Sequence, residues 1–282
     1  HYQSQYKLGL LVIKRKLNTL NKSIAVFDSG LGSLSVIRGL RSQISKENII
    51  YYADKKNFPY GQKSVDELEQ IMAETVNNLS SFDPKLIVVA SITPSIQMLD
   101  KIKSMSQIPI LGVSIPLKDA SRLTKKKHIG ILGTQGTIQS KELDEQIKSE
   151  VPQDIFVTKF DASELIEIVE KGLFLRDDDH TIRIISKYLE GLKDTNLDVL
   201  ILSSTHLSFI RSHLESMYPS VRIIDSALNA VKEIRQFLKS KNILRKNGLG
   251  RMRIIVNGNK DELQETLREM GLSGNVESFH KE

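Results

Sequence analysis

The chain has 282 residues, of which 40% are hydrophobic and 26% are charged, as is ordinary for a folded protein of one or two domains. It contains no cysteine, which excludes disulfides, thiolate metal sites and thiol nucleophiles together. The net charge is +6, but residues 1–22 hold five basic residues and no acidic one, so the remainder is nearly neutral and nucleic-acid binding is not expected.

Residues 1–22 are expected to be a basic N-terminal extension outside the folded core. No apolar run approaches the roughly 18 residues that a membrane-spanning helix needs. No signal peptide is recognisable either. We therefore expect a cytoplasmic protein without a membrane partner.

From residue 23 onward, short apolar runs alternate with longer stretches that have helical spacing. Two of these stretches, Val65–Leu79 and Ile182–Leu192, carry apolar residues three and four positions apart. Apolar strands that alternate with amphipathic helices indicate a parallel sheet covered on both faces, so an α/β fold is expected. The expected strands, in chain order, are Ile24–Phe27, Ile49–Tyr52, Leu86–Ala90, Ile110–Val113, Ile129–Leu132, Ile155–Thr158, Val199–Leu202 and Val221–Ile224.

Two segments resemble each other and suggest two similar halves. Ile24–Ser33 and Ile129–Thr137 both read as a strand followed by a hydroxyl residue beside glycine. Each is followed by a later strand that ends in serine, Ser91 or Ser204, with a threonine close behind. Ligands of open α/β sheets bind at the carboxyl ends of the strands, so these turns are expected to converge on one cleft. Capping of the following helices is the alternative interpretation of the hydroxyls.

The first turn also invites a dinucleotide-binding interpretation, because Gly30 and Gly32 follow a strand and Asp54 closes the next one. Ser35 stands where that motif needs its third glycine. Asp28 would also direct a carboxylate at a site where a pyrophosphate requires positive potential. Dinucleotide binding is therefore disfavoured.

Two further sites are weighed and disfavoured. Ser204, His206 and Asp28 contain the groups of a hydrolase triad, but no glycine permits an exposed nucleophile turn at Ser204. The run Asp177–His180 contains metal-ligand types, but consecutive side chains point in different directions. A solvated helix start is expected there, and no metal site.

Taken together, these motifs resemble glutamate racemase, of the cofactor-independent aspartate/glutamate racemase superfamily, from residue 23 to the C-terminus. The matching motifs are VFDSGLGSLSV, IIYYADKKNFPYGQKS, ILGTQGTIQS, IVEKG, IIDSALNA and RIIVNG. The resemblance implies two pseudosymmetric α/β domains with the site in the interdomain cleft, no cofactor, and a homodimer. It places the first domain at residues 24–115 and 228–282, and the second at residues 116–227.

In this family two cysteines flank the substrate Cα and exchange its proton, and the matching positions here are Ser91 and Ser204. An alcohol is about five pKa units less acidic than a thiol, or about 7 kcal/mol per base. Racemisation by two thiols is therefore not expected. Ile92, Leu207 and Ser208 also depart from the family motifs, which favours natural divergence over an engineered Cys→Ser variant.

The resemblance also implies roles for the other site residues. The family's auxiliary acid–base groups match Asp28, Glu170 and His206. Its substrate-binding positions match Ser29, Pro59, Tyr60, Gly61, Ile92, Thr93, Thr134, Thr137 and Thr205.

Three functions follow from these matches. The first is binding of a small carboxylate or amino dicarboxylate, and Ile92 in place of an amide favours an acid without an α-amino group. The second is an active racemase running on the acid–base groups, or a lyase or hydrolase that uses Ser204. The third is an interaction protein whose cleft is vestigial.

Overall fold

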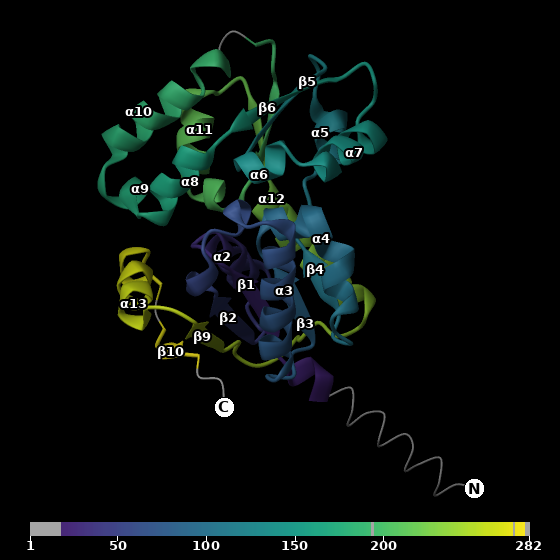
Figure 1. Ribbon diagram of the computed structural model, residues 1–282, viewed down its shortest axis with the longest axis vertical. Coiled ribbons are helices and arrows are strands. Elements are labelled where there is room, and N and C mark those ends of the chain that lie inside the picture. Colours follow the sequence, from purple (N-terminus) through teal and green to yellow (C-terminus); the bar gives the residue numbers. More distant parts are fainter. Residues whose placement is uncertain (1–17, 193–194, 273, 280–282) are drawn as a thin grey trace, which may run out of the picture.

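The computed structural model describes residues 18–192, 195–272 and 274–279 (Figure 1). Most of the expected basic extension, residues 1–17, lies outside the described residues. Residues 18–21 form a helical turn that leads into the first strand. None of the described helices is long and apolar enough to cross a lipid bilayer.

The described strands form two sheets, one of six strands in the order β10-β9-β2-β1-β3-β4 and one of four in the order β6-β5-β7-β8. All neighbouring strands pair in parallel. The strands are β1 Ile24–Asp28, β2 Ile49–Ala53, β3 Leu86–Val89, β4 Ile110–Gly112, β5 His128–Gly133, β6 Phe156–Asp161, β7 Val199–Ser203, β8 Arg222–Asp225, β9 Met252–Val256 and β10 Val276–Ser278.

Helices connect these strands and cover the sheets. The α-helices are α2 Ser33–Gln43, α3 Val65–Ser80, α4 Ile92–Ser104, α5 Leu117–Leu123, α6 Gln135–Ile138, α7 Lys141–Glu150, α8 Ser163–Glu170, α9 Leu173–Arg176, α10 Asp178–Tyr188, α11 Arg211–Met217, α12 Ser226–Ser240 and α13 Lys260–Glu269. The 3₁₀ turns are η1 Lys55–Asn57, η2 Tyr60–Gln62, η3 Glu190–Leu192 and η4 Thr205–Ile210.

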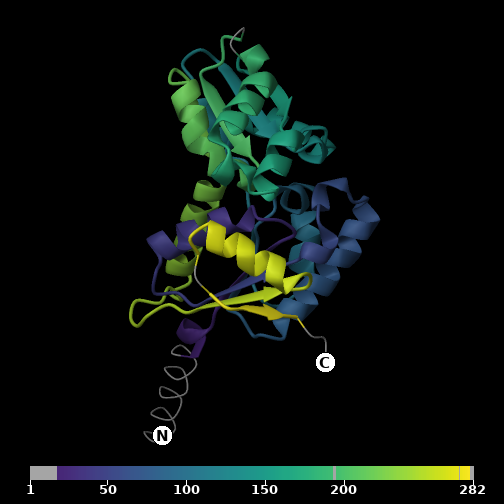
Figure 2. The same ribbon diagram turned by 90° about the vertical axis from the view of Figure 1, so that its left-hand side faces the viewer.

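The expected α/β fold with two parallel-sheet domains is confirmed, and each of the expected strands is present with ends shifted by a few residues. We call the six-stranded sheet with its helices the first domain, and the four-stranded sheet with its helices the second. The second domain, in teal and green, stands above the first in both views (Figures 1 and 2).

The expected helices also form, with local signals at their ends. The helix expected at Val65–Leu79 is α3, which begins with a capping box between Ser64 and Glu67. The stretch Ile182–Leu192 is divided between α10 and η3.

The strands nearest the cleft are fully buried because they lie at the centre of each sheet. Every residue of β1, β2, β3 and β7 is buried, whereas the edge strand β6 is partly exposed. The chain leaves β8 directly into α12, which packs along α2 in the first domain (Figure 2). A side chain at Gly39 would meet Val231 at 2.6 Å, so this glycine allows the two helices to approach closely.

The acidic run at residues 177–179 is a helix start, as expected. Asp177 accepts a hydrogen bond from the His180 amide at 2.8 Å and so caps α10. Within the described ranges, no group of three or more His, Asp or Glu side chains is placed to hold a metal ion.

Candidate functional site

A small cavity lies where the carboxyl ends of strands from both sheets face each other. It is lined by thirteen of the fourteen site residues that the sequence indicated, and Glu170 is the exception. Phe58, Ile166 and Ser203 complete the lining and were not expected there. Those thirteen residues are Asp28, Ser29, Pro59, Tyr60, Gly61, Ser91, Ile92, Thr93, Thr134, Thr137, Ser204, Thr205 and His206.

Hydroxyl groups from the two domains meet directly across the cavity. The hydroxyl oxygens of Thr93 and Thr137 lie 3.3 Å apart, and Thr134 donates to Thr137 at 2.9 Å. Thr205 of the second domain donates to the Ala90 carbonyl of the first domain at 3.2 Å. The cleft is therefore held closed by polar contacts between its own walls.

The closed cleft leaves a cavity of about 50 Å³. This space is enough for a water molecule but far below the roughly 300–1,000 Å³ of typical small-molecule sites. A ligand of amino-acid size therefore requires the two domains to separate before it can enter.

Helix capping explains only part of the hydroxyl pattern. Thr134 caps α6 by accepting from the Thr137 amide at 3.2 Å. Ser91 and Ser204 occupy the positions before α4 and η4, but neither side chain caps its helix. The two serines that ended the strands in the sequence therefore face the cavity without a capping role.

The two glycines of the first turn make room for the second domain. A Cβ atom at Gly30 would lie 2.7 Å from Glu170 Oε2 and from His206 Nε2. One at Gly32 would lie 2.2 Å from the Thr205 hydroxyl oxygen. The close approach of another domain thus accounts for the Gly-x-Gly motif without a dinucleotide.

Glu170, at the end of α8, joins the domains although it does not line the cavity. Its Oε2 accepts from the Leu31 amide at 2.7 Å and from His206 Nε2 at 2.9 Å, while Oε1 pairs with Lys55. Burial alone would raise the pKa of Glu170, but the hydrogen bond and charge of His206, with Lys55 and the Leu31 amide, lower it to about 2. Glu170 is therefore held as a carboxylate.

Asp28, at the end of β1, shows the opposite shift. Its side chain accepts from the Ser29 amide at 2.7 Å. Burial raises the pKa of Asp28 to about 6, although the charge of His206 and the Ser29 amide act to lower it. One cleft thus contains a firmly ionised carboxylate and another that takes up a proton near neutral pH.

The triad considered for a hydrolase is not assembled. His206 directs Nε2 towards Glu170, and no hydrogen bond joins His206 to Ser204 among the contacts of the described residues. Two other departures from the family motifs, Leu207 and Ser208, do not line the cavity. Leu207 is in the hydrophobic core of the second domain, and Ser208 donates to Asp225 at 2.8 Å.

Asp54 fixes the segment that contains Pro59, Tyr60 and Gly61 by a hydrogen bond from Tyr60. The Tyr60 hydroxyl donates to Asp54 Oδ2 at 2.5 Å, and Asn257 also donates to this carboxylate. The Tyr60 amide donates to the Ser29 hydroxyl at 3.3 Å. Asp54, which closes β2, therefore holds the loop over the cavity.

Lys55 and Asn257 support the site, but neither was identified from the sequence as a residue that does so. Lys55 stands in the loop motif but has its partner, Glu170, in the other domain. Asn257 follows β9, far from Asp54 in the sequence. The RIIVNG motif contains Asn257 and the loop motif contains Lys55, but neither motif indicates the partner of its residue.

Comparison with known proteins gives the same family from sequence and from structure. The model of the Asp/Glu/Hydantoin racemase family matches residues 24–234. Glutamate racemase of Bacillus cereus is 32% identical over 227 residues, which cover 80% of this chain and 83% of that protein. Glutamate racemase of Persephonella marina is also 32% identical, over 83% of this chain and 87% of its own length.

Solved structures agree. Glutamate racemase isoform RacE1 from Bacillus anthracis has a TM-score of 0.83 and 30% identity, covering 92% of this chain and 97% of its own. The Francisella tularensis glutamate racemase, solved in complex with D-glutamate, has a TM-score of 0.79 and 25% identity, covering 93% and 98%. With two parallel-sheet domains and a family match over most of its length, this chain belongs to the Asp/Glu/hydantoin racemase family and is similar to glutamate racemases.

Proposed function

We propose that this protein binds a small carboxylate, or an amino dicarboxylate, in the interdomain cleft and does not racemise it by a two-thiol mechanism. The observation that carries the proposal is the convergence of hydroxyl side chains from both domains on one cavity. Such donors suit carboxylate oxygens. The chain has no cysteine, so no thiol is available to remove or return a proton.

Similar proteins support the class of ligand. The Francisella racemase was solved with D-glutamate, and the Thermus thermophilus glutamate racemase, 28% identical to this chain, with β-chloro-D-alanine. Both ligands are carboxylates. By analogy, Ser91 and Ser204 stand at the positions of the family's two cysteines. The ligand would lie between the first domain, residues 24–115 and 228–282, and the second, residues 116–227.

Ile92 narrows the class of ligand that the cleft can bind. Its side chain is buried and lines the cavity, where the family motif has an amide. An apolar side chain removes one hydrogen-bond partner of a ligand ammonium group, and burying a charged group with fewer partners is costly. We therefore propose that glutarate binds more tightly than L- or D-glutamate. A cytoplasmic location and a homodimer remain predictions.

Titration calorimetry with glutarate and both glutamate enantiomers tests this function. The Thr93→Val, Thr205→Val double variant removes one hydroxyl from each side of the cleft and should abolish binding. A matched pair, Thr181→Val with Thr195→Val, removes hydroxyls that donate to local backbone carbonyls outside the cleft and should leave binding unchanged. Absence of binding by all three acids would instead favour a vestigial cleft.

Asp28 favours a second candidate function, an active isomerase without thiols. A buried carboxylate whose pKa lies near 6 is ionised at pH 7 and is a stronger base than an exposed one. Incubation with glutamate in heavy water would reveal exchange of the Cα proton by mass spectrometry. The binding proposal expects no exchange above background. Stereospecific exchange that disappears in Asp28→Asn would establish the isomerase instead.

A further inference from the structure

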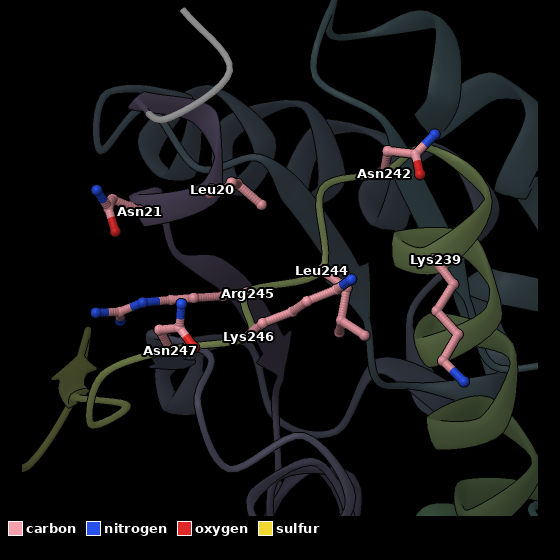
Figure 3. Close-up of a pocket in the computed structure, with 8 residues that line it drawn as sticks. All are labelled: Leu20, Asn21, Lys239, Asn242, Leu244, Arg245, Lys246 and Asn247. Atoms are coloured by element: carbon pink, nitrogen blue, oxygen red, sulfur yellow. The ribbon is translucent and has the colours of Figure 1, made fainter. Parts of the chain in front are cut away.

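A second cavity, distant from the cleft, lies at the far side of the first domain. Its volume is about 580 Å³, within the range of small-molecule sites. Figure 3 shows the lining side chains between the helical turn at residues 18–21 and the end of α12. They are Leu20, Asn21, Lys239, Asn242, Leu244, Arg245, Lys246 and Asn247.

The lining combines positive charge, amide donors and a small apolar surface. Lys239, Arg245 and Lys246 are cationic, and no acidic residue stands among the eight described residues of the lining. Three asparagines add amide groups, and two leucines add apolar contacts. Cationic and amide donors recognise phosphate oxygens, whereas leucine side chains suit the organic part of a ligand.

The walls of this cavity are fixed by a buried ion pair. Lys85 Nζ lies 2.6 Å from Glu47 Oε2, and both side chains are fully buried. Lys85 also donates to the Leu20 carbonyl at 3.1 Å, on one wall. Glu47 Oε1 accepts from the Arg245 amide at 2.7 Å, on the other wall. The pair therefore ties both sides of the cavity to the sheet.

A second link aligns the arginine. Asn48 donates to the Asn21 carbonyl at 2.8 Å and accepts from Arg245 Nη1 at 2.8 Å. The hydrogen bond to Asn48 fixes the position of the guanidinium on the wall of the cavity that also carries Asn21 (Figure 3). Lys239 and Lys246 are exposed and have no ion-pair partner among the described residues. The walls of the cavity are therefore fixed in advance, and only the two lysine side chains have to be ordered when an anion binds.

We propose that this cavity binds a small organic phosphate, a phosphate monoester with an apolar group, independently of the cleft. The phosphate would contact Lys239 and Lys246, with Arg245 on the opposite wall adding positive potential, and the apolar group would lie against Leu244 (Figure 3). The concave shape and ligand-sized volume favour a small molecule over nucleic acid, which needs an extended basic surface.

Phenyl phosphate is a suitable probe, because it carries a dianion and one apolar ring. Calorimetric titration of the full chain should show it binding at one site. Inorganic phosphate and phenol, which each represent half of the ligand, should bind more weakly. Affinity should also fall with added sodium chloride, since the contact is between charges near the surface. Absence of saturable phenyl phosphate binding would overturn the proposal.

Variants locate the site. Lys239→Gln with Lys246→Gln should weaken phenyl phosphate binding about tenfold or more. A hydrogen bond from a charged ammonium group to phosphate is stronger than one from a neutral amide, and the double variant replaces two such bonds. Lys148→Gln with Lys232→Gln removes the same charge from exposed lysines outside the cavity and should have no effect. Equal loss in both pairs would mean diffuse attraction and would refute the site, as would unchanged binding in the first pair.

The cleft provides the remaining control. The Thr93→Val, Thr205→Val variant should bind phenyl phosphate as the parent does, even though it loses carboxylate binding. Loss of phenyl phosphate in that variant would place the ligand in the cleft and overturn this proposal alone. Unchanged melting temperatures would establish that the exposed lysine variants are folded.

Discussion

Two buried charge clusters in this protein have similar chemistry and different positions. The pair Lys85–Glu47 lies within the first domain, and both side chains are fully buried. The cluster of Lys55, Glu170 and His206 bridges the domains, and its side chains are between 9% and 21% exposed. The first cluster joins segments of one domain, whereas the second joins two domains that must separate before a ligand enters.

This difference in position predicts a difference in role. An ion pair inside one domain loses its partners only when that domain unfolds, so it acts on global stability. An ion pair across a cleft loses them whenever the domains separate, so it acts on closure as well. The largest effects on unfolding are therefore expected at Lys85, and effects on closure at Lys55.

The strongest test of the comparison is Lys85→Met. It leaves Glu47 as an unpaired buried carboxylate and removes the hydrogen bonds to the Leu20 and Ile243 carbonyls. We expect a loss of about 3–5 kcal/mol in the free energy of unfolding, measured by urea denaturation.

The matched control for this prediction is Lys101→Met. Lys101 pairs with Glu69 at the surface, where its side chain is 57% exposed. Its loss should change the free energy of unfolding by less than about 1 kcal/mol. A cost for Lys85→Met no greater than for Lys101→Met would contradict a stabilising role for the buried cluster.

The next prediction concerns Glu170→Gln and its dependence on pH. The pKa of Glu170 is lowered from 4.5 to about 2 in the folded protein, so its carboxylate stabilises the fold above pH 4.5. The variant should be less stable at pH 7 by about 3 kcal/mol, from about 1.4 kcal/mol per pKa unit. The deficit should shrink as the pH falls from 4.5 towards 2. Urea denaturation at pH 7, 4 and 3 would measure this.

Glu215→Gln is the control for Glu170→Gln. Glu215 pairs with Arg211 one helical turn away on the surface of α11. Its replacement should have little effect at any of these pH values. If the loss in free energy of unfolding caused by Glu170→Gln does not change with pH, the negative charge of Glu170 is not what stabilises the fold.

The fold was predictable because its strands carry continuous apolar runs. Two strands, β9 and β10, were not among those expected. The RIIVNG motif covers most of β9 but was not interpreted as a strand, and Val276 is the one apolar residue of the three-residue strand β10, so no pattern distinguishes β10. Pairing with β9 supplies its stability. The cleft residues could be predicted because they lie at the ends of strands and match motifs of glutamate racemase.

The contacts within the cleft were less predictable. That Thr93 and Thr137 would hydrogen-bond to each other depends on how far the domains close, which no local pattern encodes. The Lys55–Glu170 pair joins residues of different domains in the same way. The basic cavity is assembled from residues 20–21 and 239–247, so only the folded chain brings its cations together.

Asp28→Asn should have the opposite sign to Glu170→Gln. The pKa of Asp28 is raised from 3.8 to about 6, so ionisation of Asp28 destabilises the folded state above pH 6 and has no effect below pH 3.8. Asparagine cannot ionise and keeps an acceptor for the Ser29 amide. The variant should therefore be more stable than the parent at pH 7, by about 1–3 kcal/mol, and equally stable near pH 4. Thermal melts at both pH values would detect this, and a variant less stable at pH 7 would contradict the assigned burial effect.

The smallest effect on stability is expected for Lys55→Met, because Glu170 keeps its hydrogen bonds with His206 and the Leu31 amide. Global unfolding should change by no more than about 1 kcal/mol, as for other partly exposed pairs. Closure should loosen, so that the Leu31 amide, which donates to Glu170 across the cleft, exchanges with heavy water about fivefold faster. Amides of the buried strand β1 should exchange as in the parent. Faster exchange throughout β1 would show that Lys55 supports the fold as Lys85 does, and the distinction between the two clusters would fail.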